Sequence, residues 1–81
     1  MDKKDQLAEL ISNAETSFYN GQLQEAFSLS LSAIKLDENC ADAYQYAANV
    51  CMSLSRYEDA IEYYQKVQIY IMLITQIEMN L

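Results

Sequence analysis

The chain contains almost no glycine or proline, the two residues that most strongly interrupt helices and strands. Its 81 residues include one glycine, Gly21, and no proline. A β-rich fold needs a turn after every short strand, and glycine and proline supply many of those turns. Long uninterrupted helices are the alternative, so the sequence predicts an all-α fold.

Apolar residues recur at spacings of three and four along four segments, as they do on one face of a helix. We expect a first helix from Asp5 to Asn20, a second from about Gln22 to Leu36, and a third from about Ala41 to Leu54. A fourth helix is expected from Tyr57 to near the C-terminus, over about 57–81, because no breaker follows it. The four helices would form one small domain over residues 1–81.

The predicted ends of the first helix rest on a few polar residues. Asp2 and Asp5 are both suitable N-caps, and the sequence does not choose between them. Asn20 and Gly21 end this helix, because glycine readily takes the left-handed conformation common after a helix C-terminus. An Asn-Gly pair can also mark a β-hairpin, but neither flank alternates apolar and polar residues.

The fourth helix begins with a pattern that resembles a known family. The segment Arg56–Lys66, RYEDAIEYYQK, is similar to the second helix of a tetratricopeptide repeat. In that family a small residue lies where the two helices of a repeat cross, with an aromatic residue on either side, and Ala60, Tyr57 and Tyr64 match those places. The helical spacing puts five residues on one apolar face: Tyr57, Ala60, Ile61, Tyr64 and Val67.

A second copy of the pattern appears at the family's repeat length of about 34 residues. With that shift, Ala14 falls on Ala48 and Ala26 falls on Ala60. The resemblance implies two helix pairs stacked as a short α-solenoid, with repeats over about 7–40 and 41–74. The first copy departs further from the family, since Asn13 replaces the usual leucine and Ser30 the usual aromatic.

The C-terminal extension, residues 68–81, departs from the repeat pattern. A turn is expected where the second repeat ends, yet apolar residues continue on almost every side of the predicted helix. This suggests burial all round. The extension could pair with a second copy, with helix exchange between chains, dock on another protein, or mark a fragment of a longer chain. The run Ile69–Ile74 is also compatible with a strand. The residues expected to mediate self-association are Ile69, Tyr70, Met72, Leu73 and Ile77.

The overall charge restricts the partners. The net charge is −7, so a nucleic-acid backbone would be repelled, and a neutral or basic protein is the expected partner. The longest apolar run is far shorter than the roughly 20 residues of a membrane helix. Cys40 and Cys51 would lie roughly 15 Å apart along a helix, too far for a disulfide, so reduced thiols and a cytoplasmic location are expected.

No residue pattern indicates catalysis. The chain has no histidine, which removes the commonest general base and metal ligand. Neither cysteine has a basic neighbour in sequence that would activate it. The acidic pairs Asp37–Glu38 and Glu58–Asp59 fit a linker and a helix start better than a metal site. We therefore expect no enzymatic activity, cofactor or metal.

The resemblance implies a binding surface instead. In the family, the first helices of the repeats line a concave groove that holds an extended peptide or a partner helix. The matching groove residues here are Ile11, Glu15, Tyr19, Asp42, Gln45, Asn49 and Met52. One subclass clamps a C-terminal carboxylate with basic residues, and the acidic residues at those places here argue against that activity. The expected function is a protein-interaction module, and the alternatives are a structural oligomerisation unit or a fragment without its own groove ligand.

Overall fold

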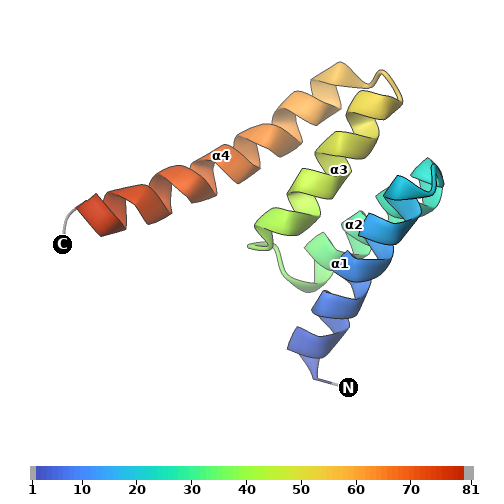
Figure 1. The fold of residues 1–81 in the computed structure, drawn as a ribbon. Helices are drawn as coiled ribbons and strands as arrows, with labels where there is room; N and C mark the ends of the chain where they lie inside the picture. The colour runs from blue at the N-terminus through green and yellow to red at the C-terminus, as the bar shows by residue number, and fades with distance from the viewer. Residues whose placement is uncertain (1, 80–81) are drawn as a thin grey trace.

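The structure is a computed structural model, which describes the backbone of residues 2–79 and the side chains of residues 2–76. In this part of the chain, four α-helices follow one another: α1 (Lys3–Tyr19), α2 (Leu23–Leu36), α3 (Ala41–Ser53) and α4 (Tyr57–Met79). The predicted all-α fold is confirmed, and α4 is long, as expected (Figure 1). The end of the fourth predicted helix, residues 80 and 81, and the side chain of Ile77 lie outside the described residues.

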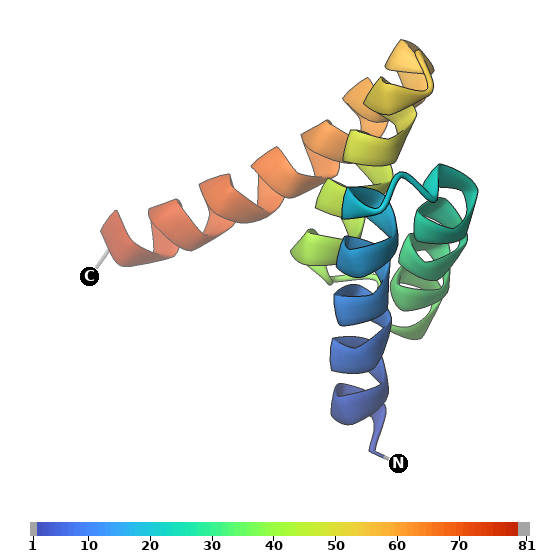
Figure 2. The same cartoon turned by 45° about the vertical axis from the view of Figure 1, so that its right-hand side comes forward.

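The helices pack as two antiparallel hairpins, α1 with α2 and α3 with α4. The hairpins meet through α2 and α3, and α1 also contacts α3. Figure 2 shows α4 leaving the other three helices and projecting to one side. This projection makes the molecule broad and thin, with overall dimensions of 42 × 35 × 19 Å.

The turns within the two hairpins have the same hydrogen bonds, 34 positions apart. After α1, the amide of Gln22 donates to the carbonyl of Ser17 at 2.9 Å, and after α3 the amide of Arg56 donates to the carbonyl of Cys51 at 2.8 Å. Gly21, just before Gln22, has a φ of 79°, as predicted, and Ser55, just before Arg56, has a φ of 62°. Both helices therefore end in a Schellman motif, in which a left-handed residue reverses the chain.

The core consists mainly of small side chains. Alanine supplies most of the fully buried positions, and the largest fully buried side chains are Val50, Cys51 and Ser30. Small residues allow helix axes to approach closely, so the helices are held by dense contact over a narrow seam. The buried alanines are Ala14, Ala26, Ala33, Ala43, Ala47, Ala48 and Ala60.

Larger side chains cover the edges of this seam. Tyr63 of α4 packs edge-on against Phe27 of α2, with ring centroids 6.3 Å apart, and lies at the same distance from the ring of Tyr44 of α3. The guanidinium of Arg56 lies 5.7 Å from the centroid of Phe27 on the same cluster. These contacts fix the second hairpin against the first.

The predicted core face of α4 was only partly right. Ala60 is buried, and Tyr64 and Val67 are half-buried, but Tyr57 and Ile61 are 54% and 55% exposed. Tyr63 takes their place in the packing. Leu31 of α2 is another exposed apolar residue. Periodicity finds the apolar face of a helix, but burial also requires a neighbouring element to cover that face.

Candidate protein-interaction surfaces

The predicted groove residues lie on α1 and α3, two helices that contact each other. Tyr19 near the end of α1 is 73% exposed, and Met52 of α3 is 46% exposed. Glu15 and Asp42 are also exposed, whereas Ile11, Gln45 and Asn49 are half-buried. Of this set, Glu15, Tyr19 and Asp42 lie near one another around the hydroxyl of Tyr46, which gives an acidic, partly aromatic face between α1 and α3.

Tyr46 belongs to the same face, although the predicted groove set left it out. Burial raises the pKa of Tyr46 to about 12, with a second contribution from its hydrogen bond to Glu15. The negative charges of Glu15 and Asp42 and the nearby Tyr19 act in the same direction. Tyr46 of α3 thus links to Glu15 of α1 within this face. Its position four residues after Asp42 was a usable signal, because residues four apart share one side of a helix.

Asn49 is partly committed to the fold rather than to a ligand. Its side-chain oxygen Oδ1 accepts a hydrogen bond from the hydroxyl of Tyr64 at 2.6 Å, which joins α3 to α4. The same oxygen accepts a second bond from Nε2 of Gln45 at 3.3 Å. Only the amide nitrogen of Asn49 is left for a partner molecule, so this residue mainly positions α4.

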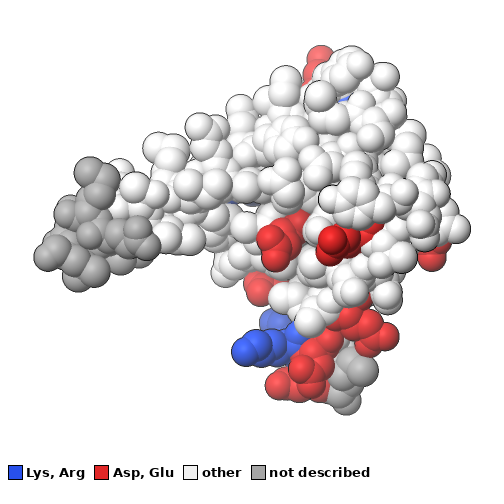
Figure 3. Space-filling model, in the orientation of Figure 1, with Lys and Arg blue, Asp and Glu red and all other residues white. Residues whose placement is uncertain are grey.

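The second surface is the part of α4 beyond Tyr70. The side chains of Ile71, Met72, Leu73 and Ile74 are each between 51% and 58% exposed, and Ile69 just before them is 54% exposed. No charged residue occurs from Val67 to Gln76. In Figure 3 this projecting segment is correspondingly white up to the grey atoms, while the acidic side chains lie on the body of the molecule.

Tyr70 marks the point where α4 leaves the rest of the fold. Its hydroxyl donates to Oδ1 of Asn39 and lies 3.4 Å from the carbonyl oxygen of Glu38, in the linker between α2 and α3. The hydroxyl of Tyr44 donates to the same carbonyl at 2.9 Å. Tyr70 was expected to contact a second copy, but its hydroxyl is already used within its own chain.

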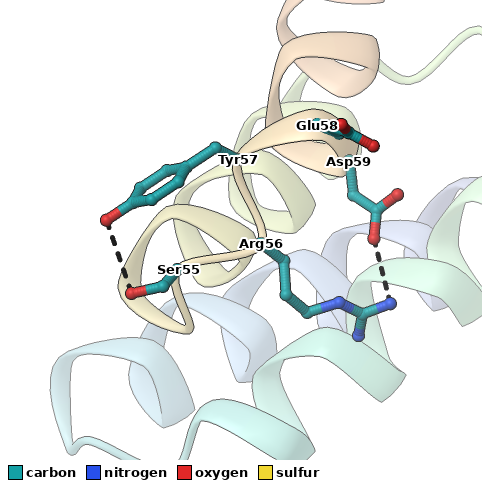
Figure 4. A pocket seen from close by; sticks show the side chains of 5 residues that line it. All are labelled: Ser55, Arg56, Tyr57, Glu58 and Asp59. Atoms are coloured by element: carbon teal, nitrogen blue, oxygen red, sulfur yellow. Dashed lines mark hydrogen bonds and ion pairs between the residues drawn. The ribbon is translucent and has the colours of Figure 1, made fainter.

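A shallow hollow surrounds the start of α4, where Arg56 and Asp59 form an ion pair of 3.0 Å (Figure 4). The figure shows Tyr57 and Ser55 on the other side of the turn, where the hydroxyl of Tyr57 donates to that of Ser55 at 3.4 Å. The guanidinium of Arg56 also packs over the ring of Phe27. The polar groups here serve the turn and the contact between the hairpins.

The residues with chemical reactivity are not assembled into a site. Cys40 and Cys51 are both free thiols, as predicted, and burial raises the pKa of Cys51. Among the described side chains, those of residues 2–76, no group of three or more cysteines, aspartates or glutamates is placed to hold a metal ion. None of the helices described here is both long enough and apolar enough to cross a membrane.

Comparison of the chain with protein-family models, with curated proteins and with solved structures gave no match. The two surfaces described above, the α1–α3 face and the α4 projection, therefore carry the functional inference.

Proposed function

We propose that this chain is a non-catalytic protein-interaction module of the tetratricopeptide type, which associates with a second copy of itself through α4. The observation that carries the proposal is the projection of α4, where Ile69 and the run Ile71–Ile74 expose large apolar side chains without a charge among them. An exposed patch of this kind usually marks a protein interface. The reduced cysteines fit a cytoplasmic location.

The two hairpin turns support the relation to tetratricopeptide repeats. The left-handed residues Gly21 and Ser55 are 34 positions apart, which is the length of that repeat. The fully buried pairs Ala14 with Ala48 and Ala26 with Ala60 have the same separation. A short repeat array of this kind can act without catalytic residues, because its helices offer a surface for another protein.

The α1–α3 face is proposed to bind an extended peptide or a partner helix. Tyr19 offers an exposed aromatic ring, and Glu15 and Asp42 give the face a negative charge, so the partner would be neutral or basic. Tyr19→Ala should reduce binding of basic peptides on an immobilised peptide array. Asn49→Ala is a poor test because it also removes the bond to Tyr64.

A second candidate function is a purely structural oligomerisation unit. The side chains of Asn49 and Gln45 favour it, because their hydrogen bonds within the fold leave fewer free polar groups for a groove ligand. In that case the two hairpins would only support α4. Loss of peptide binding in Tyr19→Ala supports the interaction module, whereas absence of peptide binding in the unchanged protein supports the structural unit.

Self-association can be tested by light scattering over a series of protein concentrations. The unchanged chain should form a dimer, and the double variant Ile71→Asp with Leu73→Asp should be a monomer with unchanged helix content. The two substitutions place charges on different sides of the α4 projection, so an interface on either side would be disrupted. A monomeric unchanged chain would contradict self-association.

A further inference from the structure

The first half of α4 has an uncovered flank that corresponds to a covered flank on α2. With the 34-residue shift, Tyr57 and Ile61 of α4 correspond to Leu23 and Phe27 of α2. Leu23 and Phe27 are half-buried, and the second hairpin covers Phe27 through Tyr63 and Arg56. Tyr57 and Ile61 remain more than half exposed. The flank therefore corresponds to the side of α2 that the second hairpin covers, but none of the helices in residues 2–79 covers it.

This flank continues into the α4 projection. Its members follow the alternation of four and three residues that lets two helices pack along their whole length. All of them are uncharged, and half-buried Tyr64 lies near the middle. The members of this flank, called here the α4 seam, are Tyr57, Ile61, Tyr64, Gln68, Ile71 and Thr75, with Met72 beside them.

We propose that the α4 seam is covered by the α4 seam of a second copy, with the two helices antiparallel. This pairing deepens the self-association proposed above and rests on it. The seam runs from Tyr57 to Thr75 and is centred near position 66. An antiparallel pair crossing there puts Tyr57 of one copy beside Thr75 of the other, and Ile61 beside Ile71. Each projecting segment then covers the uncovered flank of its partner, and the twofold symmetry closes the assembly as a dimer.

Charge favours α4 over the other end of the molecule as the partner surface. A head-to-tail stack would place the outer side of α1 on the α4 seam, and the hollow on α1 is lined by Gln6, Glu9 and Asn13 besides Leu10. That contact would bury polar and charged groups against Tyr57 and Ile61, which is costly without partners. Each copy also carries a net charge of −7, so an uncharged seam is where two copies approach with least repulsion.

Charge also selects the antiparallel direction. The first two turns of α4 carry Glu58, Asp59 and Glu62, whereas no charge occurs from Val67 to Gln76. A parallel pair would place the acidic turns side by side and align the two helix dipoles unfavourably. An antiparallel pair places the acidic turns of each copy beside the uncharged segment of the other.

Disulfide trapping tests the direction. Two chains are prepared, one with Tyr57→Cys and one with Thr75→Cys, and both carry Cys40→Ser so that, besides the introduced cysteine, only the buried Cys51 remains. The antiparallel pair predicts a disulfide-linked dimer when the two chains are mixed and mildly oxidised, and much less when either is oxidised alone. Equal cross-linking of each chain alone would show a parallel pair and overturn the inference, while self-association would stand. Positions 57 and 75 lie about 27 Å apart on one helix, so no link forms within a chain.

Light scattering of single variants tests the seam itself. Ile61→Asp should weaken dimerisation by at least tenfold although it lies outside the projection, and Met72→Asp should do the same. Leu31→Asp is the matched control, because Leu31 is an exposed leucine on α2, outside the seam, and the substitution should leave the dimer largely intact. A dimer that tolerates Ile61→Asp and is lost with Leu31→Asp would overturn the seam, and a monomeric unchanged chain would overturn both the seam and the self-association.

Helix content by circular dichroism separates these outcomes from unfolding. Ile61 and Met72 are more than half exposed, so a single aspartate at either place is expected to keep the fold. A variant that loses mass but keeps its helix content supports the seam. If Ile61→Asp unfolds the chain, the disulfide result and Met72→Asp decide the question.

Discussion

Two residues in equivalent turns differ in how well they suit their backbone. Gly21 and Ser55 both have positive φ, at 79° and 62°, but only glycine takes this conformation without steric cost. The space around Gly21 is open, so the cost of a larger residue there comes from the backbone alone. The two turns therefore form a matched pair within one molecule.

We expect Ser55→Gly to raise the free energy of unfolding by about 1 kcal/mol, because it relieves the left-handed strain. Gly21→Ala should lower the free energy of unfolding by a similar amount, because it introduces the same strain. Urea denaturation of the two variants measures both effects. Equal stability of Ser55→Gly and the unchanged chain would mean that the serine carries no strain.

Ionisation of Tyr46 is expected to lower the free energy of unfolding at alkaline pH. Burial, followed by the hydrogen bond to Glu15, raises the pKa of Tyr46 from its ordinary value of 10.0 to about 12. The unfolded chain therefore loses this proton at a lower pH than the folded chain, so the free energy of unfolding falls as pH rises from about 10 to about 12. Burial raises the pKa of Tyr44 and Tyr63 in the same direction.

Replacement of Tyr46 by phenylalanine should flatten this part of the pH profile. The variant cannot ionise at position 46, so its stability should decline less between about pH 10 and about pH 12 than that of the unchanged chain. Urea denaturation at a series of alkaline pH values measures the difference. Parallel profiles for the two proteins would show that Tyr46 ionises alike in the folded and unfolded states.

At the scale of the helix, close crossing depends on alanine. Ala60 is fully buried where α4 crosses α3. A larger side chain at this place would push the two helices apart. Ala60→Leu should cost about 1–3 kcal/mol of unfolding free energy, because the added volume forces the helices apart. Ala8→Leu is the control, since Ala8 is exposed on α1 and leucine is nearly as good a helix former. Thermal or urea unfolding compares the two.

Tyr70 sets the place where α4 separates from the linker. Its hydroxyl bonds with Asn39 and lies near the carbonyl of Glu38, so Tyr70→Phe should lower stability by about 1 kcal/mol. Hydrogen exchange of the amides near Tyr70 should become faster. Thr16→Val is a suitable comparison, because the Thr16 hydroxyl bonds only to Ser12 within its own helix. A larger loss in Thr16→Val than in Tyr70→Phe would contradict this role.

The helices themselves were predictable, because their signals are local. The predicted boundaries fall within two residues of those observed for α1, α2 and α3, and Gly21 ends its turn as expected. The left-handed conformation of Ser55 was not predictable, since serine seldom adopts it and only the equivalence with Gly21 points to it. The exposure of Tyr57 and Ile61 depends on the number of neighbouring helices, which no local pattern records.

The candidate surfaces were predictable to a smaller degree. The exposed apolar run of α4 follows directly from the sequence, because no charge interrupts it. The hydrogen bonds that Asn49 and Tyr70 form within the fold were not predictable, since each bond joins residues far apart in sequence. The contribution of Tyr46 required the proximity of α1 to α3. Side chains that link distant helices therefore need the three-dimensional arrangement.

For the whole molecule, the net charge of −7 opposes any contact between copies. An interface of uncharged residues gains nothing from counter-charges, so added salt acts mainly by screening this repulsion. We expect the dissociation constant of the dimer to fall as sodium chloride rises from about 0.05 M to about 0.5 M. Sedimentation equilibrium measures it. A dissociation constant that rises with salt would instead indicate ion pairs across the interface.

The packing of each helix on those nearest to it in sequence also bears on how the chain reaches its structure. Most contacts join α1 with α2, α2 with α3 and α3 with α4, while fewer skip a helix, namely those of α1 with α3 and of Tyr63 of α4 with Phe27 of α2. Folding therefore requires few distant segments to find each other, and chains of this kind usually fold within milliseconds. Either hairpin can form first and offer its surface to the other. The projecting end of α4 contributes little to this process, so the hairpins are expected to fold before two copies meet.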